Sequence, residues 1–210
     1  MYSRFSLAIA VSLTLQVIAS TAHGGDGAWR KVSDNDGLRV ETRELNGLPF
    51  GEIRLVAKSE SSVQTLCNVV WEAGESGEQA PNIKLRQVLE ERANVRVTYE
   101  QVKVPVVTDR DYVVQTTRKA DAKHCEVMFE SVNDRGPAPS KDHVRVPKFF
   151  GSWTFTPAGD GSVVMFTIYS DPGGGVPAHM AKGPQRDSAV VQMRTMLEKA
   201  KKMEERASLR

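Results

Sequence analysis

Histidine and cysteine are scarce in this chain, and their scarcity argues against several kinds of active site. The 210 residues include four histidines and two cysteines. His124, His143 and His179 lie in separate segments without the spacing of zinc ligands. The G-x-S-x-G motif of many serine hydrolases is also missing. We therefore predict no metal site and no catalytic residues.

A nucleotide cofactor is not expected either. The segment from Gly173 to Ala178 formally fits the G-x-G-x-x-A pattern of dinucleotide sites. Such a site needs a second parallel strand beyond its helix to carry an acidic residue, and no strand pattern follows here. We predict a protein without cofactors.

The chain has no excess of either charge. It has 28 lysines and arginines against 26 aspartates and glutamates, a formal net charge of +2. Aromatic residues make up 7% of the sequence and form no stripe with basic residues, as a single-stranded nucleic-acid site would need. We exclude nucleic acid as a partner.

Long hydrophobic runs are also rare, and the one that stands out lies at the N-terminus. Arg4 precedes an apolar stretch, 5–18, and Ser20-Thr21-Ala22 places small residues where a signal peptidase cleaves. The run of about fourteen residues is shorter than the roughly twenty that a membrane-spanning helix needs. The sequence predicts a cleavable signal peptide over 1–22, a single domain over 23–210, and a periplasmic or secreted protein.

The two cysteines leave two interpretations open. Cys67 shares a helical face with Leu66, and Cys125 shares strand parity with Val127, so both side chains are expected in the core. In an oxidising compartment they would form a disulfide, and closing a loop of roughly sixty residues would stabilise the fold by roughly 4 kcal/mol. Two buried free thiols are the alternative, because the sequence does not fix the Cα separation.

Alternating apolar and polar residues predict an antiparallel sheet of about seven to nine strands. No segment between the later strands is long enough for a crossover helix. A helix is predicted from Ser61, with Gln64 completing a capping box, and turns are predicted at 34–37 and 158–161. The expected strands cover 38–42, 53–57, 85–91, 95–102, 110–117, 124–132, 144–155 and 163–170.

The C-terminal segment organises the predicted fold. Three consecutive glycines between Pro172 and Pro177 end the last strand. A long helix in a curved antiparallel sheet is a helix-grip arrangement of the α+β class, and it encloses an apolar cavity. From Ser188 onward, apolar residues recur on one helical face: Ala189, Val190, Met193, Met196, Leu197, Ala200 and Met203.

Aromatic and methionine side chains are expected to line this cavity. Thioether chains adapt to irregular apolar ligands, although methionine is also ordinary core filler on an amphipathic helix. Arg145 would need either a carboxylate partner or a polar ligand group, because an unpaired buried guanidinium is costly. The predicted ligand-binding residues are Arg145, Phe129, Trp153, Phe155, Tyr169, Met180, Met193, Met196 and Leu197.

Six segments in order resemble the START domain, the StAR-related lipid-transfer family. The resemblance implies a helix-grip fold whose tunnel holds one lipid, with Gly173, Gly174, Gly175 and Pro177 in a gate beside the C-terminal helix. The segments are Trp29, Gly37-Leu38-Arg39-Val40, Arg110-Asp111-Tyr112-Val113, Val144-Arg145, Gly151-Ser152-Trp153-Thr154-Phe155-Thr156-Pro157 and Asp171-Pro172-Gly173-Gly174-Gly175-Val176-Pro177.

We therefore expect a monomeric, non-enzymatic carrier in the cell envelope. It would hold one lipid or sterol-like molecule in an internal tunnel and contact membranes transiently. Two alternatives stay open: a small-molecule enzyme of the cyclase or hydrolase type that uses the same cavity, and a regulatory or interaction module.

Overall fold

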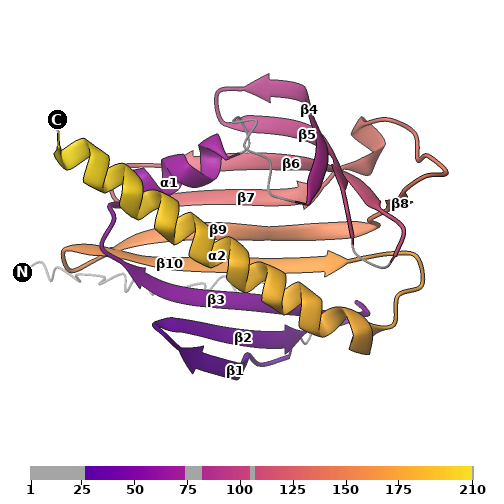
Figure 1. Cartoon of the computed structure of the whole chain (residues 1–210), viewed down its shortest axis with the longest axis horizontal. Helices are drawn as coiled ribbons and strands as arrows, with labels where there is room; N and C mark the ends of the chain where they lie inside the picture. Colours follow the sequence, from indigo (N-terminus) through magenta and orange to yellow (C-terminus); the bar gives the residue numbers. More distant parts are fainter. Residues whose placement is uncertain (1–26, 74–81, 105–106, 210) are drawn as a thin grey trace, which may run out of the picture.

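A computed structural model describes residues 27–73, 82–104 and 107–209. The expected signal peptide, residues 1–22, and the polar segment 74–78 lie outside the described residues. Within them, one broad antiparallel sheet carries two helices on the same face (Figure 1). We call this side the helix face and the opposite side the outer face.

The sheet contains ten strands in the order β1-β2-β3-β10-β9-β7-β6-β5-β4, with β8 lying parallel to the start of β6. The predicted antiparallel arrangement is confirmed, but the sheet has ten strands rather than seven to nine, and the strand over residues 30–35 is not among those expected. The strands are β1 (Arg30–Asn35), β2 (Leu38–Glu44), β3 (Gly51–Ser59), β4 (Ile83–Arg92), β5 (Val95–Val102), β6 (Arg110–Ala120), β7 (Cys125–Ser131), β8 (Val144–Arg145), β9 (Lys148–Ala158) and β10 (Gly161–Asp171). The helices are α1 (Val63–Glu72), a short 3₁₀ turn η1 (Asn133–Arg135) and α2 (Ala178–Ser208).

The predicted turns connect neighbouring strands. Asp36 and Gly37 take φ values of 51° and 73° between β1 and β2, and Gly159 takes 62° between β9 and β10. The expected single strand over 144–155 is wrong, because Pro147 separates β8 from β9. Proline has no N–H to donate and is disfavoured inside a sheet.

Strand alternation places the core on the helix face. Inward residues of β2, β3, β7, β9 and β10 pack against α1 and α2 in one cluster. Its fully buried members include Leu55, Leu66, Phe155, Phe166 and Met193. Each such side chain contributes roughly 1.5–3 kcal/mol by leaving water.

The first helix begins one residue later than predicted. Ser62 is the N-cap, and its hydroxyl accepts the Thr65 N–H at 3.1 Å. Ser61 is buried instead, and its carbonyl accepts the Ser162 hydroxyl at 2.9 Å. At the other end, the guanidinium groups of Arg96 and Arg118 each lie over the Trp71 ring, 4.6 Å from its centroid.

A disulfide ties α1 to the sheet. Cys67 and Cys125 form a bond with a Cα separation of 6.0 Å, so the disulfide interpretation holds and the free-thiol alternative does not. Both residues are 1% exposed. The bridge joins α1 covalently to β7 in the core.

The second helix is longer than the apolar pattern from Ser188 indicates. It begins ten residues earlier, at Ala178, and Gly183 and Pro184 lie inside it. These two residues interrupt the apolar periodicity, which is why the pattern alone starts later. The helix is roughly 46 Å long and runs diagonally across the helix face (Figure 1). Among the described residues, no helix is long and apolar enough to cross a membrane.

Replacing both cysteines with serine, as Cys67→Ser with Cys125→Ser, should destabilise the protein by about 4 kcal/mol. The bridge closes a sequence separation of 58 residues, and opening that loop raises the entropy of the unfolded chain. Urea denaturation measures the loss. A reducing agent should lower the midpoint of the native protein and leave the double variant unchanged; equal stability of the two proteins in the absence of reductant would contradict the prediction.

Candidate ligand-binding site

An array of aromatic rings crosses the helix face from β6 to β10. Tyr112 lies 5.3 Å from Phe149, Phe149 lies 5.0 Å from Phe129, and Phe129 lies 6.2 Å from Phe166, all between ring centroids. Phe166 stacks on Trp153 at 3.9 Å. Phe129–Phe149 and Trp153–Phe166 are contacts between neighbouring strands, whereas the other two contacts reach across one intervening strand on the same face. The array forms a continuous apolar surface.

A polar group closes one end of this array. The Tyr112 hydroxyl donates to Glu100 Oε2 at 2.7 Å, and Arg86 Nε donates to Glu100 Oε1 at 2.7 Å. Arg86 also donates to the Ala73 carbonyl at the end of α1. The side chains of Arg86 and Glu100 are 17% and 8% exposed. Burial and the neighbouring charge of Glu100 raise the pKa of Tyr112 well above 10. Its hydroxyl therefore stays protonated at neutral pH.

The helices cover the aromatic array unevenly. Trp153, Phe155 and Phe166 are buried beneath them, whereas Tyr112 and Phe149 are only half-buried. Figure 1 shows α1 over one end of β6 and β7 and no helix over their other end, within the part of the chain that is described. The half-buried rings lie there, so this end of the array is the accessible one.

The structure brings together most of the predicted cavity residues. Phe129, Trp153 and Phe155 belong to the helix-face core, and Met193, Met196 and Leu197 of α2 pack against it. Met193 is fully buried and Met196 is 6% exposed. The aromatic rings and α2 thus form opposite sides of one apolar layer.

Three predicted residues lie elsewhere. Tyr169 belongs to a separate cluster with Leu45, Phe50 and Ala181 where α2 begins. Met180 is 62% exposed on α2. Arg145 lies on the outer face, where its guanidinium donates two 2.9 Å bonds to the Asp111 carboxylate. These positions separate the three residues from the aromatic array.

Asp111 and Arg145 hold β8 against β6. Asp111 is fully buried and also accepts the Tyr99 hydroxyl at 3.1 Å. Burial alone would raise the pKa of Asp111, but the hydrogen bonds and charge of Arg145 lower it below its ordinary value. Arg145 also donates to the Pro137 carbonyl at 3.0 Å. The pair therefore anchors the excursion between β7 and β9.

The expected gate segment joins β10 to α2. Gly173, Gly174 and Gly175 have φ values of 64°, 64° and 68°, a left-handed conformation that side-chain-bearing residues rarely adopt. Pro177 follows as the N-cap position of α2. The glycines are therefore required by the backbone where the chain turns from the sheet to the helix.

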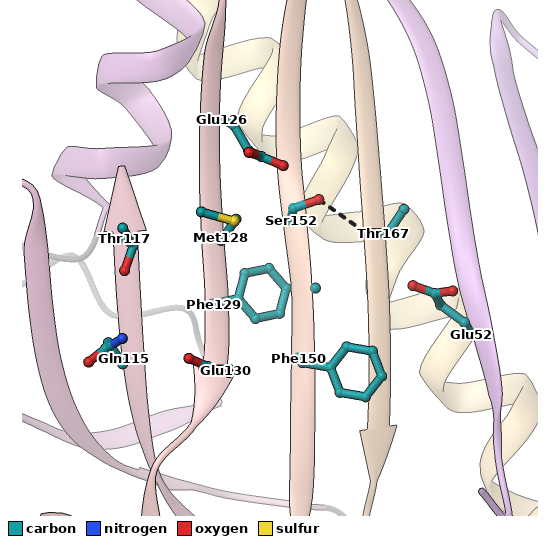
Figure 2. A pocket seen from close by; sticks show the side chains of 11 residues that line it. Glu52, Gln115, Thr117, Glu126, Met128, Phe129, Glu130, Phe150, Ser152 and Thr167 are labelled. Atoms are coloured by element: carbon teal, nitrogen blue, oxygen red, sulfur yellow. Dashed lines mark hydrogen bonds between the residues drawn. The ribbon is translucent and has the colours of Figure 1, made fainter. Parts of the chain in front are cut away.

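A shallow hollow of about 410 Å³ lies on the outer face. Figure 2 shows its side chains in front of the strands, with α2 behind them. Glu52, Glu126 and Glu130 line it beside Met128 and Phe150. A surface with three carboxylates does not suit an acyl chain, so we do not place an apolar ligand there.

Metal chemistry has no candidate in the described segments, where no group of three or more His, Cys, Asp or Glu side chains is arranged to hold an ion.

Sequence reasoning missed the polar end of the array. Glu100 lies in a predicted strand, but nothing in the pattern indicates that Arg86 and Tyr112 meet it from the strands on either side. In the sequence, Tyr112 stands out only as part of the segment Arg110-Asp111-Tyr112-Val113. Its parity, opposite to that of Asp111, is the signal that places it on the helix face.

No protein-family model matches the chain. An uncharacterized protein of Pseudomonas aeruginosa is 24% identical to this chain over 176 residues. The match covers 80% of this chain and 87% of the Pseudomonas protein.

Solved structures with the same fold include a STAR-related lipid transfer protein fragment from Xanthomonas axonopodis. It has a TM-score of 0.72 and 23% identity over 82% of this chain and 98% of its own. Human STARD10 has a TM-score of 0.72 and 18% sequence identity, and the match covers 84% of this chain and 74% of STARD10. The Zhui aromatase/cyclase of a Streptomyces species has a TM-score of 0.52 and 14% sequence identity, and the match covers 71% of this chain and 93% of the enzyme. The shared fold thus occurs in lipid carriers and in enzymes.

Asp111→Asn should destabilise the protein by about 3 kcal/mol, because it removes one partner of a largely buried ion pair. The lowered pKa of Asp111 adds stability above its unfolded pKa of about 4, and this stability is lost as the pH falls. Urea midpoints between pH 6 and pH 3 should therefore fall less steeply in the variant than in the native protein. Asp160→Asn, in the exposed β9–β10 turn, is the control; parallel pH profiles for all three proteins would refute the assignment.

Proposed function

We propose that this chain, a START-like domain, binds one hydrophobic ligand between the aromatic array and α2 and carries it in the cell envelope. The ligand is a lipid or a sterol-like molecule. The observation that carries the proposal is that an apolar surface has one polar group, Arg86–Glu100–Tyr112, at its accessible end. An amphipathic molecule likewise has an apolar part and a polar end.

The polar group favours a ligand that donates a hydrogen bond. Tyr112 uses its proton on Glu100, which leaves its hydroxyl oxygen as an acceptor. Glu100 oxygens have further lone pairs beyond the bonds from Arg86 and Tyr112. A ligand hydroxyl or amide N–H fits these acceptors. Each methylene buried along the rings adds roughly 0.8 kcal/mol of transfer free energy.

We place the carrier in the periplasm or outside the cell, as a monomer that touches membranes transiently. The N-terminal segment has the composition of a signal peptide, and the Cys67–Cys125 disulfide suits an oxidising compartment. The exposed Met180 at the start of α2 offers an apolar contact for a bilayer. The intact mass of the purified mature protein tests cleavage after Ala22.

Cyclase chemistry is the second candidate, favoured by the aromatase/cyclase fold relatives and by the polar group beside the array. Here the Glu100 carboxylate, whose oxygens keep acceptor capacity toward the array, would take a proton from the substrate. This reading expects turnover of a polyketide substrate without any membrane present. Glu100→Gln would abolish that turnover.

Native mass spectrometry of the protein purified from its own envelope should show one co-purified lipid per chain. Solvent extraction then identifies the lipid. Incubation of a stripped sample with mixed liposomes should restore the bound mass. A ligand-free mass that stays unchanged after this incubation would contradict lipid carriage.

Tyr112→Phe should weaken binding of the identified ligand by about three- to tenfold, the value of one hydrogen bond of roughly 1 kcal/mol. Tyr99→Phe is the matched control, because Tyr99 also binds a carboxylate, Asp111, but on the outer face. It should leave ligand affinity unchanged. Fluorescence titration measures both affinities, and equal losses in the two variants would remove Tyr112 from the site.

A further inference from the structure

Arg110, at the start of β6, is a buried cation whose hydrogen bonds go only to the backbone. The residue is 5% exposed. Its Nε donates to the Pro172 carbonyl at 3.1 Å, and its Nη1 donates to the Thr108 carbonyl. The adjacent Asp109 forms an ion pair with Lys84 instead. Among the described residues, Arg110 thus has no carboxylate partner, although a buried charge is costly unless it is paired.

Other shielded arginines of this chain are neutralised. Three of them pair with a carboxylate and have side chains 17%, 2% and 12% exposed: Arg86 with Glu100, Arg96 with Glu91 and Arg145 with Asp111. Burial lowers the pKa of Arg110 and the nearby charge of Asp109 opposes this, but a guanidinium stays protonated at neutral pH. Arg110 therefore keeps a full positive charge in a shielded place.

The third nitrogen of this guanidinium faces a small space beside Gly174. Nη2 has no hydrogen-bond partner among the residues that the structure describes. A Cβ at Gly174 would lie 3.6 Å from Nη2 and 3.4 Å from each methyl group of Val144. Gly174 is exposed, so solvent reaches this space. An anionic oxygen placed there can accept a hydrogen bond from Nη2 at the usual length of roughly 2.7–2.9 Å.

The register of β6 relates Arg110 to the aromatic array. Arg110 pairs with Val102 and Tyr112 pairs with Glu100 on β5. Alternate residues of a strand point to the same face, so Arg110 precedes Tyr112 on the helix face by about 7 Å. The Tyr112 ring lies at the accessible end of the array. A shielded cation therefore follows the apolar surface along the same strand.

We propose that Arg110 Nη2 and the space beside Gly174 form a binding site for an anionic oxygen of a carboxylate or phosphate group. The ligand of the aromatic array is then an acidic amphiphile, with its chain on the rings and its acid on Arg110. A hydroxyl or N–H of the same head group meets Glu100. The site for the acid stands without the proposed lipid-binding function, whereas the identity of the amphiphile rests on it.

Calorimetric titration of the native protein tests the preference for an acid and needs no variant. Dodecyl phosphate and dodecanol carry the same chain and differ in charge. Dodecyl phosphate should bind about tenfold more tightly or more, the value of a hydrogen bond between charged groups. Equal affinities of the two compounds overturn the anion site and leave lipid binding intact.

Two neighbouring glycines provide a matched pair of variants. Gly174 and Gly175 have φ values of 64° and 68°, so alanine causes similar backbone strain at either position. Only a Cβ at Gly174 enters the space beside Nη2, because a Cβ at Gly175 meets no atom within 4 Å. Gly174→Ala should reduce the preference for dodecyl phosphate over dodecanol about fivefold or more, whereas Gly175→Ala should keep it. An equal reduction in both variants, or in neither, refutes the site.

Inorganic phosphate separates the anion site from the lipid-binding function. It should bind the native protein and Gly175→Ala more weakly than dodecyl phosphate does, and Gly174→Ala should weaken it further. Phosphate binding of this pattern without binding of either dodecyl compound supports the anion site and refutes the acidic amphiphile and the lipid-binding function. Phosphate that binds as tightly as dodecyl phosphate assigns the site to a free anion and refutes the amphiphile. Absence of binding by all three compounds refutes both proposals.

Discussion

Burial of the apolar helix face of the sheet is the constraint on which the rest of this structure depends. An antiparallel sheet with one apolar face must be covered, and here two helices do so from the same side. The first is attached by a disulfide, and the second packs its methionines beside the first. Because a helix lying diagonally across a broad sheet cannot cover all of it, part of the aromatic surface stays half-buried. The candidate site lies in that part, with the polar group Arg86–Glu100–Tyr112 at its edge.

The two faces of the sheet divide the charged residues into two roles. On the outer face, Asp111 and Arg145 satisfy each other and hold β8 in place. On the helix face, Glu100 binds Arg86 and Tyr112 but retains acceptor capacity toward the aromatic array. Adjacent residues Asp111 and Tyr112 therefore serve different purposes, because strand alternation sends them to opposite faces. The same alternation separates Arg145 from the apolar layer in which it was expected.

Burial is likewise divided unevenly along α2. The disulfide, α1 and Glu204 fix the part of the helix that buries methionines. The part before Pro184 buries an alanine and follows three glycines. Gly183 and Pro184 lie between these two parts of the helix.

The sequence by itself determined most of the strands, the helix face of α1 and the apolar stripe of α2, because period-2 and period-3.6 patterns depend only on local spacing. It did not indicate β1 or the break between β8 and β9. It also indicated the core aromatic residues Phe129, Trp153 and Phe155. Only the tertiary structure decided that Cys67 meets Cys125, that Arg145 pairs with Asp111 and that Glu100 joins Arg86 and Tyr112. These contacts join residues on different elements, and their distances depend on strand order and register rather than on any local pattern. The early start of α2 was also a tertiary result, since contacts of Ala181 with the Tyr169 cluster stabilise helical turns that Gly183 and Pro184 disfavour locally.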